Sequence, residues 1–267
     1  IKSLDPKPNE KILDLCCCPG AKLIYIADII KSSQNFAFGK ESKIVGNDIS
    51  GDRLRICRNL IGKSGNEDII ELTNQDAVYF KWIDDSFFDR VLVDVECTHD
   101  GSFKHIVKFL AGGKYTKKIK KVGPEKKISN NEKKRRVMQK VRNEKTKELG
   151  SKYFSAYEKK NEWTKEDFKS RVLDGKKLEI LGHLQEEILY RGFCLVKEDG
   201  ILVYSTCSLS KTQNEDVIQK LIDRLASENS QFTPKIQDPW DQNFMGELND
   251  DFKKSYGMRD GLCLIHI

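Results

Sequence analysis

The stretch LDLCCCPGAK, Leu13 to Lys22, decides the fold class of this chain. It begins as a short apolar run typical of a buried strand, and it ends in a Pro-Gly turn from which a helical pattern, AKLIYIADIIKS, starts at once. Such a turn brings backbone amides close to a ligand, and the start of the helix offers unpaired N–H groups. The segment therefore indicates the nucleotide-binding corner of a doubly wound α/β sheet.

The acids that follow the next two strands indicate which nucleotide binds. The strand KIVGNDIS (Lys43–Ser50) ends in Asp48, and DIIELTNQDAVYF (Asp68–Phe80) is predicted to be a third strand that ends in Asp76. Neither the phosphate loop G-x-x-x-x-G-K-[ST] nor the dinucleotide pattern G-x-G-x-x-G is present. Asp48 is placed to accept hydrogen bonds from both ribose hydroxyls, and Asp76 from an adenine amino group. These contacts suit an adenosine ligand without phosphates, which predicts S-adenosylmethionine. Taken singly, each acid is more typical of a helix cap or turn.

The alternation of strand and helix continues along the chain. DRVLVDVEC (Asp89–Cys97) is a fourth strand, ILVYSTCS (201–208) is a later core strand, and GLCLIHI (261–267) is a terminal strand. Helical patterns separate most of them. The sequence thus predicts an α/β fold, a mostly parallel seven-stranded sheet with helices on both faces, as one domain over residues 1–267.

A basic segment interrupts this series. Of the 267 residues 33% are charged and the net charge is +6, but residues 104–147 alone hold 17 Lys and Arg against 3 Glu. We predict a flexible insertion at about 105–170, with 104–147 as an arm that contacts RNA phosphates; a solvated, disordered insertion is a compatible interpretation. No apolar run approaches the roughly 18 to 20 residues needed to span a membrane.

The cysteine pattern favours a reduced intracellular protein, without distinguishing nucleus or nucleolus, cytoplasm and organelle. The eight cysteines are Cys16, Cys17, Cys18, Cys57, Cys97, Cys194, Cys207 and Cys263. Because the first three are contiguous and no second C-x-x-C or H-x-x-x-H pair is present, we expect no metal site.

Two cysteines occupy positions where α/β enzymes place reacting groups. Cys97 follows the fourth strand, and Cys207 lies in YSTCSLSKTQNEDV (Tyr204–Val217) at the exit of the next core strand. A lone cysteine is usually a packed thiol, but both exits should meet at one edge of the sheet beside the cofactor corner. A helix opening after Cys207 would favour its thiolate.

The blocks LDLCCCPGAK, NDISGDRL, VDVEC and YSTCSLSKTQNEDV resemble, in order, the signature blocks of the Sun-type (NSUN, RsmB-like) RNA cytosine-5 methyltransferases. The resemblance covers roughly 1–104 and 173–226 plus the last strand. It implies a Rossmann-like class I methyltransferase that transfers a methyl group from S-adenosylmethionine to carbon 5 of cytosine in rRNA or tRNA, through a covalent cysteine–cytosine intermediate.

The resemblance also implies residue roles. Cys207 would be the nucleophile, Cys97 would assist product release as base or second thiol, Asp94 would hydrogen-bond the cytosine, and Lys22 would lie near the target base. The implied cofactor site comprises Cys16, Cys17, Cys18, Pro19, Gly20, Ala21, Lys22, Asp48, Arg53, Asp76 and Asp94. Glu96 departs from the family, which usually has Pro there, and its charge is expected to raise the Cys97 pKa. An N-terminal RNA-binding module is expected to be absent from this sequence.

Two other functions compete with this interpretation. One is a catalytically weak RNA-binding or ribosome-assembly factor that retains the fold; the intact Cys97, Cys207, Asp94 and Lys22 argue against it. The other is a methyltransferase acting on DNA or protein. The cysteine of the S-T-C sequence discriminates, because methylation of an amine or carboxyl group needs no nucleophilic thiol.

Overall fold

Strand β1 (Lys11–Asp14) leads through a tight turn into helix α1 (Ala21–Ser32), as the sequence predicts. Gly20 ends this turn with φ 106°, a backbone conformation that residues with a Cβ atom rarely adopt. A Cβ at Gly20 would also lie 2.5 Å from Cys57 Sγ, so the turn and helix α2 (Gly51–Ser64) approach closely there. The peptide bond between Cys18 and Pro19 is cis.

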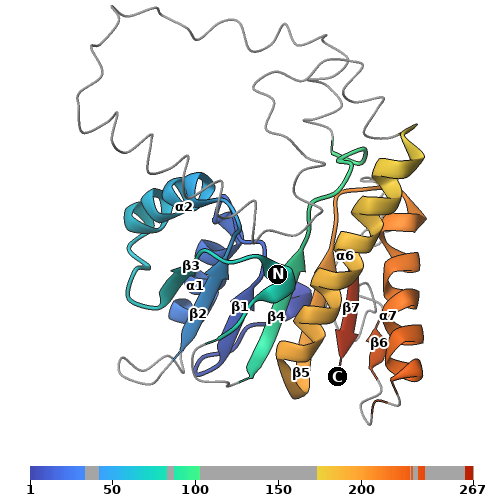
Figure 1. Ribbon diagram of the computed structural model, residues 1–267. Helices are drawn as coiled ribbons and strands as arrows, with labels where there is room; N and C mark the ends of the chain where they lie inside the picture. Colours follow the sequence, from blue (N-terminus) through green and yellow to red (C-terminus); the bar gives the residue numbers. More distant parts are fainter. Residues whose placement is uncertain are drawn as a thin grey trace, which may run out of the picture. The chain divides into compact units, whose positions relative to one another are not determined.

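The structure, a computed structural model, describes residues 1–33, 42–82, 87–102, 173–228, 230, 234–237 and 262–266, the last five by their backbone alone (Figure 1). It divides into two compact units: Ile1–Cys97 with Gly182–Ile267, and Thr98–Leu181. The predicted insertion at about 105–170 and the basic arm 104–147 lie outside the described residues.

One sheet runs through the first unit in the order β3-β2-β1-β4-β5-β7-β6. The remaining strands are β2 (Lys43–Asn47), β3 (Ile70–Thr73), β4 (Phe88–Asp94), β5 (Val196–Ser205), β6 (Lys235–Gln237) and β7 (Leu262–His266). The five strands from β3 to β5 pair in parallel, and β7 pairs antiparallel with both β5 and β6. The prediction of a mostly parallel sheet is confirmed.

Apolar side chains alternate between the two faces of the sheet. Ile12 and Ile44 belong to the core that α1 and α2 cover, whereas Leu13 and Val45 belong to the core that α6 (Gly175–Leu195) and α7 (Glu215–Ser227) cover. In Figure 1, α6 lies in front of the sheet and α1 behind it. Because successive side chains of a strand point to opposite faces, both faces bury apolar surface, and the prediction of helices on both faces is confirmed.

Several element boundaries differ from the sequence expectation. Strand β1 ends at Asp14 rather than Cys17, and β3 ends at Thr73 rather than Asp76. The Asp76 carboxylate instead caps the short 3-10 helix η2 (Ala77–Tyr79) by accepting from the Val78 N–H at 3.0 Å. The cap was the alternative that the residue type alone favoured, because an Asp side chain satisfies an otherwise unpaired N–H at a helix start.

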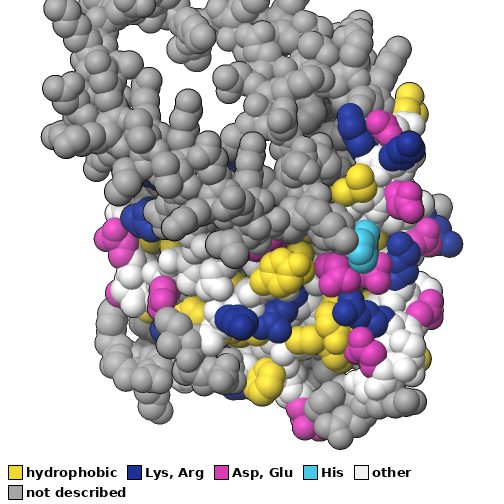
Figure 2. All heavy atoms as spheres, viewed as in Figure 1, with side chains coloured by type: hydrophobic (Ala, Val, Ile, Leu, Met, Phe, Trp, Pro, Cys, Tyr) yellow, Lys and Arg dark blue, Asp and Glu magenta, His cyan; other side chains and the backbone are white. Residues whose placement is uncertain are grey.

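The described surface mixes both signs of charge. In the face shown in Figure 2, basic and acidic side chains lie interspersed over the described residues of α6 and α7. Ion pairs such as Arg224–Glu187, at 2.9 Å, account for part of this mixing. None of the described helices is both long and apolar enough to cross a membrane.

Candidate active site

Parallel strands β4 and β5 end side by side. Asp94, the last residue of β4, lies opposite Ser205, the last residue of β5, and the Val95 N–H donates to the Ser205 carbonyl at 3.3 Å. The segments that follow both strands therefore leave the same carboxyl edge of the sheet. Ligands of open α/β sheets bind outside this edge, which is where the sequence placed the two candidate cysteines.

The two cysteines meet at this edge. The Sγ atoms of Cys97 and Cys207 lie 3.1 Å apart, and the Cys207 backbone N–H donates to Cys97 Sγ at 3.4 Å. Cys97 is 1% exposed, whereas Cys207 is exposed. The pair thus has an inner thiol and an outer thiol, and only the outer one is open to a ligand as large as a nucleobase.

The surroundings of Cys207 favour the protonated thiol. The hydrogen bond with Cys97 raises the pKa of Cys207 well above its ordinary value, and burial and the negative charges of Asp94 and Glu96 act in the same direction. The helix predicted to open after Cys207 is α7, which begins at Glu215, and the 3-10 helix η5 begins before it at Lys211. The expected effect of Glu96 on the Cys97 pKa stays a prediction.

The loop that carries Cys207 is held by a buried asparagine. Asn214 is 5% exposed; its amide N–H groups donate to the carbonyls of Ser208 and Ser210, both at 3.0 Å. The Thr206 hydroxyl donates to Asn214 Oδ1 at 2.6 Å, and the Ser208 N–H donates to the Thr206 hydroxyl. These bonds explain the hydroxyl-rich turn: it fixes the position of the thiol. Sequence reasoning missed Asn214, although the sequence S-x-S-x-x-x-N was the available signal.

A buried glutamine links the loop after β4 to the loop after β5. The Gln185 side chain of α6 is fully buried, and its Nε2 donates to the Glu96 carbonyl at 2.8 Å and to Gln213 Oε1 at 3.4 Å. The Gln213 carbonyl in turn accepts from the Tyr204 hydroxyl at 2.7 Å. Both cysteine-bearing segments are therefore tied to the same side chain. The pattern of apolar residues in α6 did not predict this link, because it identifies apolar core positions and Gln185 is a polar residue buried among them.

Asp94 has a defined polar environment. Its Oδ2 pairs with Lys22 Nζ, and its Oδ1 accepts from the Ser205 hydroxyl at 2.8 Å. Its side chain is 30% exposed and that of Lys22 is 42% exposed, so both remain accessible to a ligand. The structure thus joins two residues that lie 72 positions apart in sequence.

The corner around β2 holds the second predicted acid. Asp48 is 3% exposed; its Oδ1 accepts from the Ser50 N–H at 2.8 Å, and its Oδ2 lies 3.5 Å from the Arg53 guanidinium. Arg53 also donates to the Cys18 carbonyl at 2.7 Å, so it connects α2 to the turn after β1. The thiols of Cys17 and Cys18 face each other at 4.0 Å, and both side chains are buried.

The structure adds one acid that the sequence reasoning missed. Asp14 ends β1; its Oδ1 accepts from the Cys16 N–H at 3.1 Å, and its buried Oδ2 has no hydrogen-bond partner among the described residues. Burial raises the Asp14 pKa to about 7, and the nearby charges of Asp94 and Asp48 add to this rise. An acid at the end of the first apolar strand was a signal of the same kind as Asp48.

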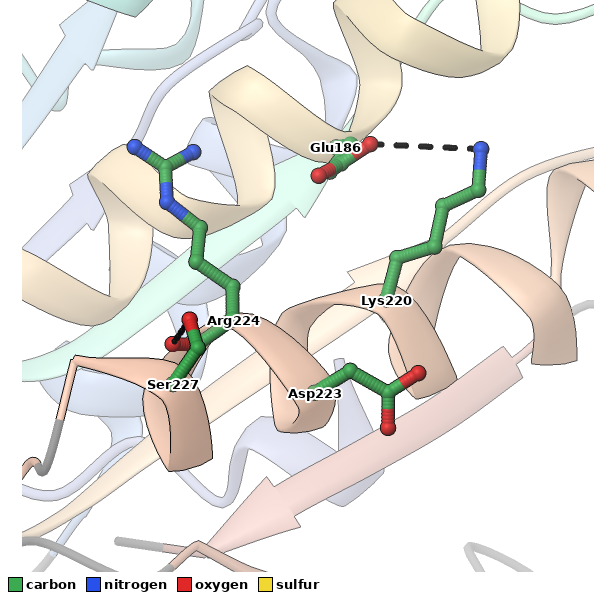
Figure 3. Close-up of a pocket in the computed structure, with 5 residues that line it drawn as sticks. All are labelled: Glu186, Lys220, Asp223, Arg224 and Ser227. Atoms are coloured by element: carbon green, nitrogen blue, oxygen red, sulfur yellow. Dashed lines mark hydrogen bonds and ion pairs between the residues drawn. The ribbon is translucent and has the colours of Figure 1, made fainter.

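A separate shallow pocket lies between α6 and α7 (Figure 3). Glu186, Lys220, Asp223, Arg224 and Ser227 line it. Two of its charges are paired, because Lys220 Nζ lies 3.9 Å from Glu186 Oε2. The Ser227 hydroxyl donates to the Arg224 backbone carbonyl at 2.7 Å. None of the residues predicted for catalysis or cofactor binding lies in this pocket.

A doubly wound, mostly parallel sheet with acids and paired cysteines at its carboxyl edge defines a Rossmann-like methyltransferase fold with a thiol site. The sequence matches the family described as "16S rRNA methyltransferase RsmB/F" over residues 1–150 and 164–247. The chain belongs to this family, and the resemblance seen in the sequence is confirmed.

Known relatives carry related names. The chain is 24% identical over 221 residues to a "tRNA (cytosine(49)-C(5))-methyltransferase" of Pyrococcus abyssi, covering 83% of this chain and 49% of the relative. It is 24% identical over 242 residues to "5-cytosine rRNA methyltransferase NSUN4" of Bos taurus, covering 89% of this chain and 45% of the relative. The chain thus spans about half the length of these two relatives.

Solved structures share the fold. The crystal structure of NSun6 from Pyrococcus horikoshii with SFG has a TM-score of 0.56 and 18% identity, and it covers 99% of this chain and 50% of that chain. A methyltransferase homolog protein from the same organism has a TM-score of 0.54 and 21% identity, covering 98% of this chain and 62% of that chain. At these identities the likeness establishes the fold class.

Proposed function

We propose that this chain is the catalytic part of an S-adenosylmethionine-dependent RNA cytosine-5 methyltransferase that modifies a cytosine of rRNA or tRNA. The observation that carries the proposal is the meeting of Cys97 and Cys207, whose Sγ atoms lie 3.1 Å apart beside Asp94 at the carboxyl edge of the sheet. Membership of the RsmB/F family and the names of the relatives support the same reaction.

The cofactor corner suits a cationic adenosine ligand. Burial, together with repulsion from Asp94 and Asp48, raises the Asp14 pKa, and Asp14 Oδ2 is a buried acceptor without a partner among the described residues. A ligand with positive groups would reduce the repulsion between these carboxylates and would give Asp14 Oδ2 a hydrogen-bond donor. S-adenosylmethionine is such a ligand, and when bound it supplies an activated methyl group.

The cofactor contacts follow from the positions of the individual groups. We assign the ammonium group to Asp14, the ribose hydroxyls to Asp48 and the adenine amino group to Asp76. The turn from Cys16 to Ala21 would contribute its backbone, because the Cys17 and Cys18 thiols are buried away from a ligand. Arg53 would hold this turn through the Cys18 carbonyl.

Cys207 is the nucleophile in this reaction. Its Sγ–H bond breaks, the sulfur electron pair forms a bond to carbon 6 of the cytosine, and the displaced ring electrons make carbon 5 nucleophilic. The raised pKa of Cys207 means that a base must take its proton as the cytosine binds. Asp94, held by Lys22 and Ser205, would accept a hydrogen bond from the exocyclic amine of the cytosine, or, when it carries a proton, would donate it to the ring nitrogen where negative charge develops.

Cys97 completes the cycle. After methylation the hydrogen on carbon 5 leaves as a proton, its electron pair restores the ring double bond, and the bond between carbon 6 and Cys207 breaks to release the thiolate. Cys97 lies next to Cys207 and is placed to assist this release. The target cytosine must leave its stack to reach this site, and the segment 104–147 would hold the RNA through phosphate contacts.

The test is methyl transfer from labelled S-adenosylmethionine to total RNA, with nucleoside analysis and a denaturing gel. We expect 5-methylcytosine with the wild type, none with Cys207→Ala, and RNA that stays covalently attached to Cys97→Ala. Cys194→Ala, which changes a thiol near the end of α6, before β5 begins, is the matched control and should behave like the wild type.

Two results would redirect the proposal. Full activity of Cys207→Ala would refute the assignment of the nucleophile. A wild-type chain that binds RNA and S-adenosylmethionine but forms no 5-methylcytosine on any RNA would favour the RNA-binding or assembly factor, with Glu96 as the first residue to replace.

A further inference from the structure

A second group of cysteines converges behind the turn that follows β1. Cys17 and Cys18 belong to this turn, and Cys57 belongs to α2. The three Sγ atoms all lie within 4.8 Å of one another, and those of Cys17 and Cys18 are 4.0 Å apart. The three residues are 4%, 7% and 0% exposed, so the cluster is closed to solvent.

We infer that Cys17, Cys18 and Cys57 form a binding site for one soft, thiophilic metal ion, held by three thiolates. A metal–sulfur bond of about 2.3 Å places two sulfurs on one ion roughly 3.8 to 4.0 Å apart. The Cys17–Cys18 separation of 4.0 Å matches this value, whereas a disulfide needs its sulfurs at about 2.05 Å. The site lies apart from the Cys97–Cys207 pair and goes beyond the proposed methyl transfer.

The donor set indicates which ion binds. Soft thiolate sulfur selects monovalent copper, zinc and iron–sulfur centres. Among the described residues this cluster has three donor atoms, whereas structural zinc is almost always bound by four. Three sulfurs with no fourth donor among the residues that the structure describes favour monovalent copper, so copper(I) is the ion that we assign.

Local backbone contacts make the site rigid before an ion binds. The Cys17 N–H donates to the Asn47 carbonyl at 2.8 Å, and Arg53 donates to the Cys18 carbonyl at 2.7 Å. The positive charge of Arg58, the next residue along α2, also favours the thiolate form of Cys57. An ion here would join α2 to the turn that we assign to the cofactor, so metal binding would stabilise that turn.

The contiguous Cys16–Cys18 run argued against a metal on spacing alone. The ligand that changes this conclusion is Cys57, which lies 39 positions after Cys18 in sequence and reaches it through the close approach of α2 at Gly20. The competing interpretation is that three thiols merely fill the core, as free cysteines often do.

The experiment is an anaerobic titration of the full chain with copper(I), carried by a competing chelator. The background is Cys97→Ala with Cys207→Ala, which removes the other pair of thiols. We expect one copper ion per chain by elemental analysis, a thiolate-to-copper charge-transfer band in the ultraviolet, and three sulfur neighbours by X-ray absorption. A parallel titration with zinc should give weaker binding.

The decisive variant is Cys57→Ser, and Cys194→Ser is its matched control. We expect Cys57→Ser to weaken copper binding at least about 100-fold, more than the loss of an outer-sphere contact costs, and Cys194→Ser to leave it unchanged. Equal affinity in a folded Cys57→Ser chain, or no copper on the parent chain, would overturn the inference. If Cys57→Ser does not fold, the sulfur count on the parent chain decides: three supports the site, and two or fewer refutes it.

Discussion

The molecule contains two groups of neighbouring cysteines that differ in what surrounds them. At the carboxyl edge, Cys207 is exposed and lies beside the Asp94–Lys22 pair. Behind the turn after β1, the cluster of Cys17, Cys18 and Cys57 is buried in the core that α1 and α2 cover. Sulfur atoms lie close together in both groups, so proximity alone does not identify a reacting thiol. Exposure to solvent and nearby polar side chains distinguish Cys207 from the buried cluster.

The pKa shifts of the two groups sharpen this contrast. Within the buried cluster, hydrogen bonds between the thiols lower the pKa of Cys57 and raise that of Cys17, whereas the hydrogen bond with Cys97 raises that of Cys207. The most acidic of these thiols, Cys57, is therefore an inaccessible one. A reacting thiol must both ionise and be reachable by the substrate. Cys207 is exposed and therefore reachable, but its proton must still be removed.

The largest expected effect is a difference in thiol accessibility. Once the rates are corrected for the ionised fraction of each thiol, Cys207 in the native, metal-free chain should react with iodoacetamide at least about 1000-fold faster than Cys57, because Cys57 must wait for a local opening that costs several kcal/mol. Peptide mass spectrometry over time measures both rates. In the urea-unfolded chain the two should react at similar rates. Similar rates in the native chain would remove the contrast between the two groups.

Asp94→Asn tests the polar side of the edge site. The substitution keeps the shape of the side chain but removes the charge that pairs with Lys22, so we expect kcat/KM for methyl transfer to fall by about 10²–10⁴-fold. Asp223→Asn in the pocket of Figure 3 is the matched control and should be near wild type. A loss of less than about tenfold for Asp94→Asn would show that Cys97 and Cys207 suffice without the acid.

Asp14→Asn tests the buried acid between the two groups. The pKa of Asp14 is about 7 in the folded chain and near 4 when unfolded, so the folded state retains a proton that the unfolded state releases. The free energy of unfolding therefore falls as pH rises from about 4 to 7, by up to about 4 kcal/mol. Urea unfolding of ligand-free protein at several pH values should show this slope in wild type.

The same unfolding series on Asp14→Asn provides the comparison. The variant cannot ionise at this position, so its slope between pH 4 and 7 should be smaller than that of the wild type. Binding of S-adenosylmethionine to wild type should also tighten as Asp14 ionises above pH 7, and that gain should vanish in Asp14→Asn. Identical slopes in the two proteins would mean that Asp14 is already ionised in the fold.

Gly20→Ala gives the smallest effect and tests the contact behind the turn. The φ of 106° strains any residue with a Cβ, and that Cβ would lie 2.5 Å from Cys57 Sγ, so we expect a loss of about 1–3 kcal/mol in the free energy of unfolding. Cys57→Ala removes this sulfur, so Gly20→Ala should cost less in that background. A double-mutant cycle by urea unfolding measures the difference, and strictly additive effects would contradict the contact.

Much of the fold follows from local patterns in the sequence. The apolar run and Pro-Gly turn of Leu13–Lys22 place β1 and α1, and the alternation of strands with helices predicts the parallel sheet. The topology then brings the exits of β4 and β5 together, which is why Cys97 and Cys207 were predicted to meet. Periodicity and turn chemistry are properties of neighbouring residues, so they can be recognised before folding.

The remaining features depend on contacts between distant segments. Only the packing of α2 against the turn brings Cys57 to Cys18, and only burial beside Asp94 raises the pKa of Asp14. Asp76 was assigned to a strand end by pattern, yet the tertiary structure makes it the cap of η2. Desolvation and long-range pairing are set by which surfaces come together. The sequence by itself therefore determined the fold class and the cysteine pair, and the tertiary structure decided the acid environment and the second group of thiols.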